Sequence, residues 1–169
     1  MSAASGSPTP LDIAQAETRA SFANRALVYL HLYQTLAEEL GPEQAIELMR
    51  RAIYDRGVEI GEKYREAAEE GDMEEIGALF CDGSPCGGEL FEPGVEELGT
   101  SRIVLRMTAC PLVEAWREHG VPEYEIDVLC GIAAAVDEGT FEGAGLDIEI
   151  LERLGQPDGE RCLLDIRLR

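Results

Sequence analysis

The chain has 169 residues, of which 34 are acidic and 14 are basic, so its net charge is −20 at pH 7. A surface with this charge repels phosphate backbones and anionic membranes, which argues against nucleic acid or membrane partners. No apolar run approaches the roughly 20 residues of a membrane span, and the N-terminus lacks the basic and apolar regions of a signal peptide.

Cysteine and lysine content indicate the cellular setting. Five cysteines are an odd number, so they cannot all pair in intramolecular disulfides. Unpaired thiols are stable in a reducing compartment, and the predicted location is therefore the cytoplasm. Lys63 is the sole lysine and arginine supplies the other 13 basic residues, a bias typical of a GC-rich bacterial genome.

The first half of the chain has the periodicity of helices. Residues 1–10 are predicted to form a disordered tail, and apolar residues then recur at helical spacing as far as about Cys81. Glycine and proline residues divide this part. We predict one helix that ends at Gly41-Pro42, a second over residues 43–70 and a short third over residues 73–80.

The second half changes to a mixed pattern after a glycine-rich loop at residues 81–88. Apolar and polar residues alternate in three segments, as expected for strands. Pro111 and Pro122 each stand where a helix would begin. In chain order we predict a strand over 102–110, a helix over 112–119, a helix over 122–138, and strands over 146–154 and 161–168.

This order of elements predicts the fold class. Helices followed by a strand, two helices and two strands favour an α+β domain, with a small antiparallel sheet and helices on one side. Residues 11–169 are expected to form one domain, made of a helical part (11–81) and a cysteine-bearing α/β part (100–169).

Three cysteines are the strongest candidates for a functional site. Cys110 lies at a strand end, Cys130 in a helix and Cys162 in the last strand. Thiols on three separate elements can meet only through tertiary folding, a pattern that suits a metal site or a reactive pocket. The competing interpretation is that each cysteine simply packs in the core as a small apolar residue, and we prefer it for Cys81 and Cys86.

Carboxylates accompany these thiols. Asp127 and Asp137 share one face of the predicted helix over residues 122–138 with Cys130. Either carboxylate could assist proton transfer, although such a face is more often merely solvated. Cys110 directly precedes a predicted helix, whose N-terminus is expected to lower the thiol pKa and favour the thiolate.

Short motifs in residues 100–169 resemble those of the L-2-amino-thiazoline-4-carboxylic acid hydrolase family. They are a strand ending in Cys-Pro-Leu (110–112), a helix with Leu-Cys (129–130) and a closing Gly-x-x-Cys (159–162). The same half is distantly similar to 4-vinyl reductase domains, in which cysteines and a carboxylate can hold zinc. In that comparison Cys130 and Cys162 correspond to two of the family's thiols.

The first resemblance implies a hydrolase that opens a C–N bond of a small cyclic amidine or amide. Two mechanisms are open. Cys110, Cys130 and Cys162 could hold Zn²⁺, or alternatively iron, with water at a free position. Alternatively, the Cys110 thiolate could attack the substrate while Asp127 or Asp137 assists proton transfer.

Two other functions are compatible with the sequence. The 4-vinyl reductase resemblance implies a small-molecule-binding or sensory module with a structural cysteine-bound zinc. Its pocket is expected between the long helices and the sheet, near Gly57, Gly61 and Tyr64. The third is a structural protein whose cysteines only pack. A homo-oligomer is left open in each case.

Overall fold

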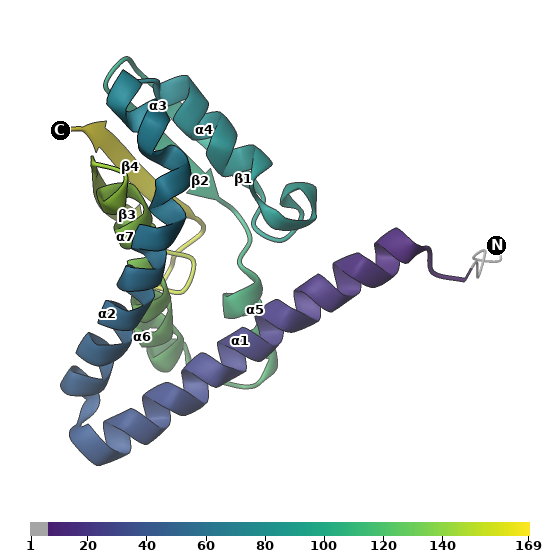
Figure 1. The fold of residues 1–169 in the computed structure, drawn as a ribbon. Coiled ribbons are helices and arrows are strands. Elements are labelled where there is room, and N and C mark those ends of the chain that lie inside the picture. Colours follow the sequence, from purple (N-terminus) through teal and green to yellow (C-terminus); the bar gives the residue numbers. More distant parts are fainter. Residues whose placement is uncertain (1–6) are drawn as a thin grey trace.

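The computed structural model describes residues 7–169 (Figure 1). The predicted tail over residues 1–10 therefore lies mostly outside the described part; residues 7–9 have no regular structure and the first helix begins at Pro10. The helices and 3₁₀ turns are α1 (Pro10–Leu40), α2 (Pro42–Gly61), η1 (Glu62–Tyr64), α3 (Arg65–Glu70), α4 (Met73–Asp82), η2 (Pro85–Gly88), α5 (Pro111–Glu118), α6 (Glu123–Ala133) and α7 (Ala135–Gly143). The strands are β1 (Pro93–Leu98), β2 (Arg102–Met107), β3 (Leu146–Glu152) and β4 (Cys162–Leu168).

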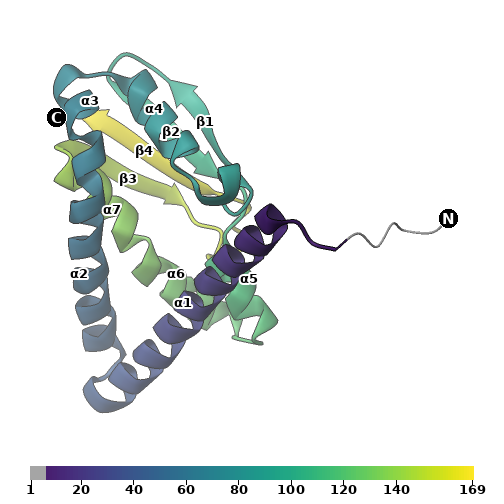
Figure 2. The same cartoon turned by 45° about the vertical axis from the view of Figure 1, so that its right-hand side comes forward.

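The strands form one antiparallel sheet in the order β1-β2-β4-β3, which confirms the predicted α+β class. Its inner face carries the buried side chains of Ile103, Leu105, Leu164 and Ile166. These pack with residues of α3, α4 and α7 in one apolar cluster, so the helices cover one face of the sheet (Figure 2).

The opposite face of the sheet is held by ion pairs. Asp165 is 2% exposed there and accepts hydrogen bonds from Arg102 and Arg167. Because two guanidinium groups offset its desolvation, the pKa of Asp165 stays below its usual value in spite of burial. The long arginine side chains therefore cover a face that has no helix layer.

Strand β1 was absent from the predicted elements. It begins with Pro93 and Gly94, and a bulge interrupts its pairing with β2 between Val95 and Glu97. Proline, glycine and a bulge are tolerated at a sheet edge because one side of the strand needs no partner. These features remove the regular alternation by which a strand is recognised in a sequence.

The two longest helices form a V in which the N-terminal end of α1 projects away from the sheet (Figure 1). Gly41, with a φ of 87°, separates α1 from α2 where the sequence predicted a helix end. Trp116 of α5 fixes α1 to the body, since its buried indole N–H donates to the Ala26 carbonyl at 2.7 Å. No helix within residues 7–169 has both the length and the apolar character needed to cross a membrane.

Two predicted helices are divided in the structure. The helix expected over residues 43–70 is interrupted by the 3₁₀ turn η1 after Gly61. The helix expected over residues 122–138 breaks at Ala134, where the Asp137 amide donates a hydrogen bond to the Ala134 carbonyl at 3.0 Å. Helix α7 follows this break and continues to Gly143. This break lets α6 pack near α5 while α7 packs along α2.

The glycines of α2 serve helix packing. A side chain at Gly57 would overlap the Val136 carbonyl and lie 2.9 Å from the Thr140 amide, and one at Gly61 would overlap the Thr140 carbonyl. The backbones of α2 and α7 are thus in direct contact. The binding pocket predicted near Gly57, Gly61 and Tyr64 is filled by α7, and Tyr64 is itself buried against Phe141.

This contact makes a testable prediction about stability. Gly139→Ala is expected to lower the free energy of unfolding by about 1–3 kcal/mol, because the new methyl group would overlap the Tyr54 carbonyl of the facing helix. Gly99→Ala is the matched control, since its methyl group would meet only the Arg102 carbonyl at 3.4 Å. Chemical denaturation of both variants measures the difference, and equal stabilities would contradict the close helix contact.

Candidate active site

The three candidate cysteines come from three elements that meet beside one core cluster. Cys110 is the residue before α5, Cys130 lies in α6 and Cys162 begins β4. Cys130 is a buried member of the cluster that contains Trp116 and Leu129, and Cys110 and Cys162 pack against the same cluster half-buried. The fold thus gathers side chains that lie 20 and 32 positions apart in the sequence.

Cys110 occupies the N-cap position of α5. The backbone amides of Leu112 and Val113 face the thiol and lower its pKa, as expected at a helix N-terminus. Burial has the larger effect and raises the pKa of Cys110 to about 11. The prediction of a thiolate at this position is therefore wrong for the free protein, because desolvation outweighs the helix amides.

Cys130 and Cys162 both contact one short backbone segment. The Leu154 amide donates to the Cys162 sulfur at 3.4 Å. The next residue, Gly155, lies so close to Cys130 that an added side chain would come within 2.9 Å of the sulfur. Burial raises the pKa of Cys162 to about 12 and also raises the pKa of Cys130. All three thiols are therefore neutral at pH 7.

Asp137 carries a carboxyl group that interacts electrostatically with two of these thiols. Burial raises its pKa to about 7, and the nearby charge of Glu138 adds to the effect. Within residues 7–169 no cation forms an ion pair with it. Its negative charge in turn raises the pKa values of Cys110 and Cys162, by less than burial does, so Asp137 lies within electrostatic range of both sulfurs. The site thus contains a carboxyl group that gains and loses a proton near neutral pH.

Asp127 has a different environment from Asp137. Its carboxylate forms an ion pair with Arg153 at 2.8 Å, and the Asp127 carbonyl accepts a second hydrogen bond from the same guanidinium at 3.0 Å. The two aspartates were predicted on one helix face, but the break at Ala134 puts Asp137 on a separate helix. Of the two predicted acid–base residues, Asp137 is the one without a competing partner.

The arrangement of the thiols does not form a ready metal site. No group of three or more His, Cys, Asp or Glu side chains in the described part of the chain is placed to hold a metal ion. Cys130 and Cys162 instead face the amides of Gly155 and Leu154, while Cys110 faces the amides of α5. The three cysteines as they stand therefore do not fit zinc or iron. Binding of either metal by this protein remains a prediction.

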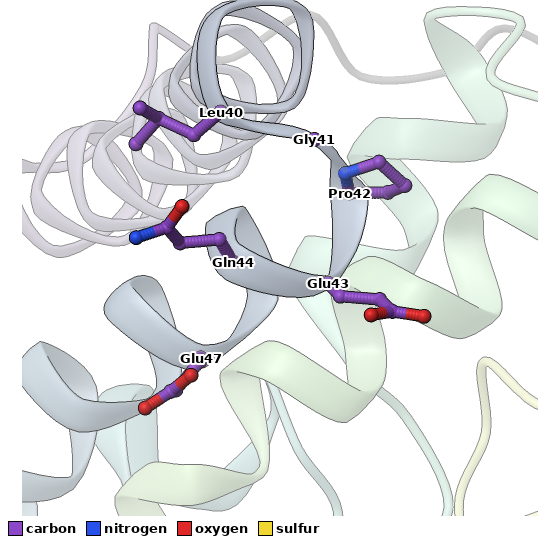
Figure 3. Close-up of a pocket in the computed structure, with 6 residues that line it drawn as sticks. All are labelled: Leu40, Gly41, Pro42, Glu43, Gln44 and Glu47. Atoms are coloured by element: carbon purple, nitrogen blue, oxygen red, sulfur yellow. The ribbon is translucent and has the colours of Figure 1, made fainter.

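Two open hollows in the surface of the described residues lie away from the cysteines. One lies between α3, α7 and Arg169. The other lies at the turn between α1 and α2, where apolar and polar residues line it in equal number (Figure 3). The residues around this second hollow are Leu40, Gly41, Pro42, Glu43, Gln44 and Glu47. Neither hollow brings together groups with the reactivity of the cysteine cluster.

Comparison with known proteins adds a family to this geometry. The sequence model of L-2-amino-thiazoline-4-carboxylic acid hydrolase matches residues 21–156, most of the chain. The chain belongs to the L-2-amino-thiazoline-4-carboxylic acid hydrolase family. The match extends from the N-terminal helices through Cys110, Cys130 and Asp137, so the resemblance predicted for the second half covers much of the first half too. Cys162 lies beyond the matched residues.

Other comparisons of this hydrolase-family chain concern its fold. Among solved structures, it is similar to trafficking protein particle complex subunit 3 from Naegleria fowleri, determined covalently bound to palmitic acid. The TM-score is 0.54 at 10% identity, over 89% of this chain and 96% of that one, a likeness that shows the fold alone. No curated protein matches the sequence significantly.

Two residues of this site were not predicted from the sequence. Arg153 and Gly155 lie in the connection between β3 and β4, where the sequence predicted the end of a strand over 146–154 and the start of a turn. Nothing in a single sequence distinguishes Arg153 from the other 12 arginines. Their contacts with Asp127 and Cys130 arise because the connection folds back across α6.

Proposed function

We propose that this protein hydrolyses a C–N bond of a small cyclic amidine, with Cys110 as nucleophile and Asp137 as general acid and base. The carrying observation is that Asp137, whose burial raises its pKa to about 7, lies within range of electrostatic interaction with the neutral thiols of Cys110 and Cys162. Family membership supports hydrolysis of such a ring. A carboxyl group with this pKa is partly protonated and partly ionised at neutral pH. A residue that must both accept and return a proton needs both of these states.

Cys110 suits the nucleophilic role better than the other two thiols. The amides of Leu112 and Val113 face its sulfur, so negative charge that develops there is stabilised by N–H groups and by the end of α5. Cys162 has the higher pKa, about 12, and Cys130 is the most buried of the three thiols. The same buried surroundings strengthen the attraction between Asp137 and a positively charged amidinium group.

The steps follow from these positions. The Cys110 thiol loses its proton to the Asp137 carboxylate as the sulfur adds to the amidine carbon, forming a tetrahedral adduct. The adduct collapses when the ring C–N bond breaks, and Asp137 returns the proton to the departing nitrogen. Water then adds to the sulfur-bound carbon, giving a proton to Asp137. The thiolate leaves as the new hydroxyl group passes its proton to the freed amine of the product and becomes a carbonyl. Asp137 returns its proton to the sulfur, and a ring-opened product one water heavier than the substrate is released.

Turnover of 2-amino-thiazoline-4-carboxylic acid by purified, untagged protein tests the proposal. Mass spectrometry is expected to show a product heavier by one water, which carries one ¹⁸O atom when the reaction is run in H₂¹⁸O. A ligand-binding module would bind the ring and leave its mass unchanged. Absence of ring opening for this acid and for related cyclic amidines would reject the proposed function.

Metal removal separates the two mechanisms. After dialysis against a strong chelator, activity is expected to persist, because the thiol mechanism requires only Cys110, Asp137 and water. Metal analysis of the untreated protein and of Cys130→Ser is the matched measurement. Stoichiometric zinc or iron that is lost in Cys130→Ser, together with activity lost on chelation and restored by that metal, would favour the metal mechanism.

A further inference from the structure

Arg153 reaches across the site from the end of β3 to α6. Its guanidinium donates to the Asp127 carboxylate at 2.8 Å and to the Asp127 carbonyl at 3.0 Å. Gly131 permits this approach, since an added methyl group would lie 2.8 Å from the nearer terminal nitrogen. The arginine side chain is 24% exposed, so a ligand can still reach it.

The guanidinium lies beside Cys130, against the neighbouring Gly131. Its positive charge lowers the pKa of Cys130, whereas the charge of Asp137 acts on Cys110 and Cys162. The two residues that follow Arg153 contact the sulfurs directly, as described above. The cysteine cluster therefore has a cation beside Cys130, and an acid whose charge acts on Cys110 and Cys162.

We propose that Arg153 binds the carboxylate of the substrate and is the residue that makes the site specific for ring acids. This inference rests on the proposed function, in which the amidine end of the ring faces Asp137. A guanidinium has five N–H donors, and two of them are used by Asp127. A carboxylate entering a chain with a net charge of −20 needs such a local cation.

Arg117 is the alternative cation and provides a control. It also lies near the cysteine cluster, since its guanidinium is 3.5 Å from the Leu154 carbonyl oxygen. Its guanidinium forms two hydrogen bonds of 3.1 Å with Glu123 and is about half exposed. Because this pair is more exposed than the pair of Arg153 with Asp127, Arg117 is expected to contribute little to recognition of the ring acid.

Binding of an unreactive analogue tests the inference without turnover. Thiazolidine-4-carboxylic acid has the ring carboxylate without the amidine, and its carboxamide is the neutral counterpart. By calorimetry the wild type is expected to prefer the acid, and Arg153→Gln to bind the acid about 10- to 100-fold more weakly with little change for the carboxamide. Arg117→Gln and Asp127→Asn are expected to keep the preference, since the second breaks the same ion pair but leaves the cation.

The outcomes are separable. Equal binding of acid and carboxamide by the wild type would overturn the inference, as would a preference retained by Arg153→Gln. If Asp127→Asn also loses the preference for the acid over the carboxamide, the inference is overturned and the role of Arg153 is structural. Arg153→Lys keeps the positive charge at this position. It therefore shows whether weaker binding by Arg153→Gln comes from loss of the charge or from unfolding of the variant. The wild type could prefer the acid, and Arg153→Gln could lose that preference, although no ring opening is observed. This combination would reject the proposed function and leave the inference about Arg153 in place.

Discussion

Asp137→Asn is expected to make the protein more stable at pH 8 while it removes most of its activity. A carboxylate with a folded-state pKa of about 7, against an ordinary value of 3.8, is disfavoured by the fold once it is ionised. Each pKa unit corresponds to about 1.4 kcal/mol. Because the asparagine amide is also polar and must be desolvated, we expect a net gain of about 1–3 kcal/mol at pH 8.

The pH dependence of this effect has a definite sign. Between pH 4 and pH 7 the folded protein holds a proton on Asp137 that the unfolded chain has lost, so stability falls as pH rises through this window. Asp137→Asn should therefore stabilise the protein at pH 8 and change it little near pH 4. Thermal unfolding of wild type and variant at both pH values measures the difference.

The matched control is Asp127→Asn, which loses the ion pair with Arg153 and should not stabilise the protein at pH 8. The kinetic part of the prediction is a loss in kcat/KM of about 10²- to 10⁴-fold for Asp137→Asn, since asparagine cannot exchange the proton. A variant that keeps full activity would contradict the acid–base role. If Asp137→Asn is no more stable than the wild type at pH 8, the inference that Asp137 is an unpaired, desolvated carboxylate is contradicted.

Cys110→Ser is expected to lower kcat by about 10³-fold or more while leaving the fold intact. Serine retains the shape of the side chain, but its hydroxyl is far less acidic than a thiol and is not a comparable nucleophile. Single-turnover reaction of the wild type, quenched with acid, should trap the ring-opened group on the peptide that contains Cys110.

The remaining cysteines provide graded controls for this experiment. Cys86→Ser alters a thiol in η2 and should leave kcat unchanged. Cys130→Ser and Cys162→Ser alter the neighbours of the nucleophile and should reduce activity without abolishing the trapped adduct. Recovery of the adduct on Cys130 or Cys162 would transfer the nucleophilic role to that residue.

Much of the fold could be predicted from local signals. Pro111 indicated the start of α5, and the alternation around Ile103 and Leu164 indicated strands β2 and β4. Strand β1 could not be recognised, because an edge strand tolerates proline, glycine and a bulge. The break at Ala134 could not be predicted either, since alanine favours a helix and the interruption serves the contact between α7 and α2.

The sequence by itself determined which groups are available: thiols on three elements, acids near one of them and the family motifs around Cys110 and Cys130. Only the tertiary structure decided their protonation. A pKa depends on desolvation and on charges contributed by distant parts of the chain. Burial makes Cys110 a neutral thiol in spite of its place at a helix start, and it gives Asp137 a pKa of about 7. The connection after β3 brings Arg153 to the same cluster, a position that no spacing in the sequence indicates.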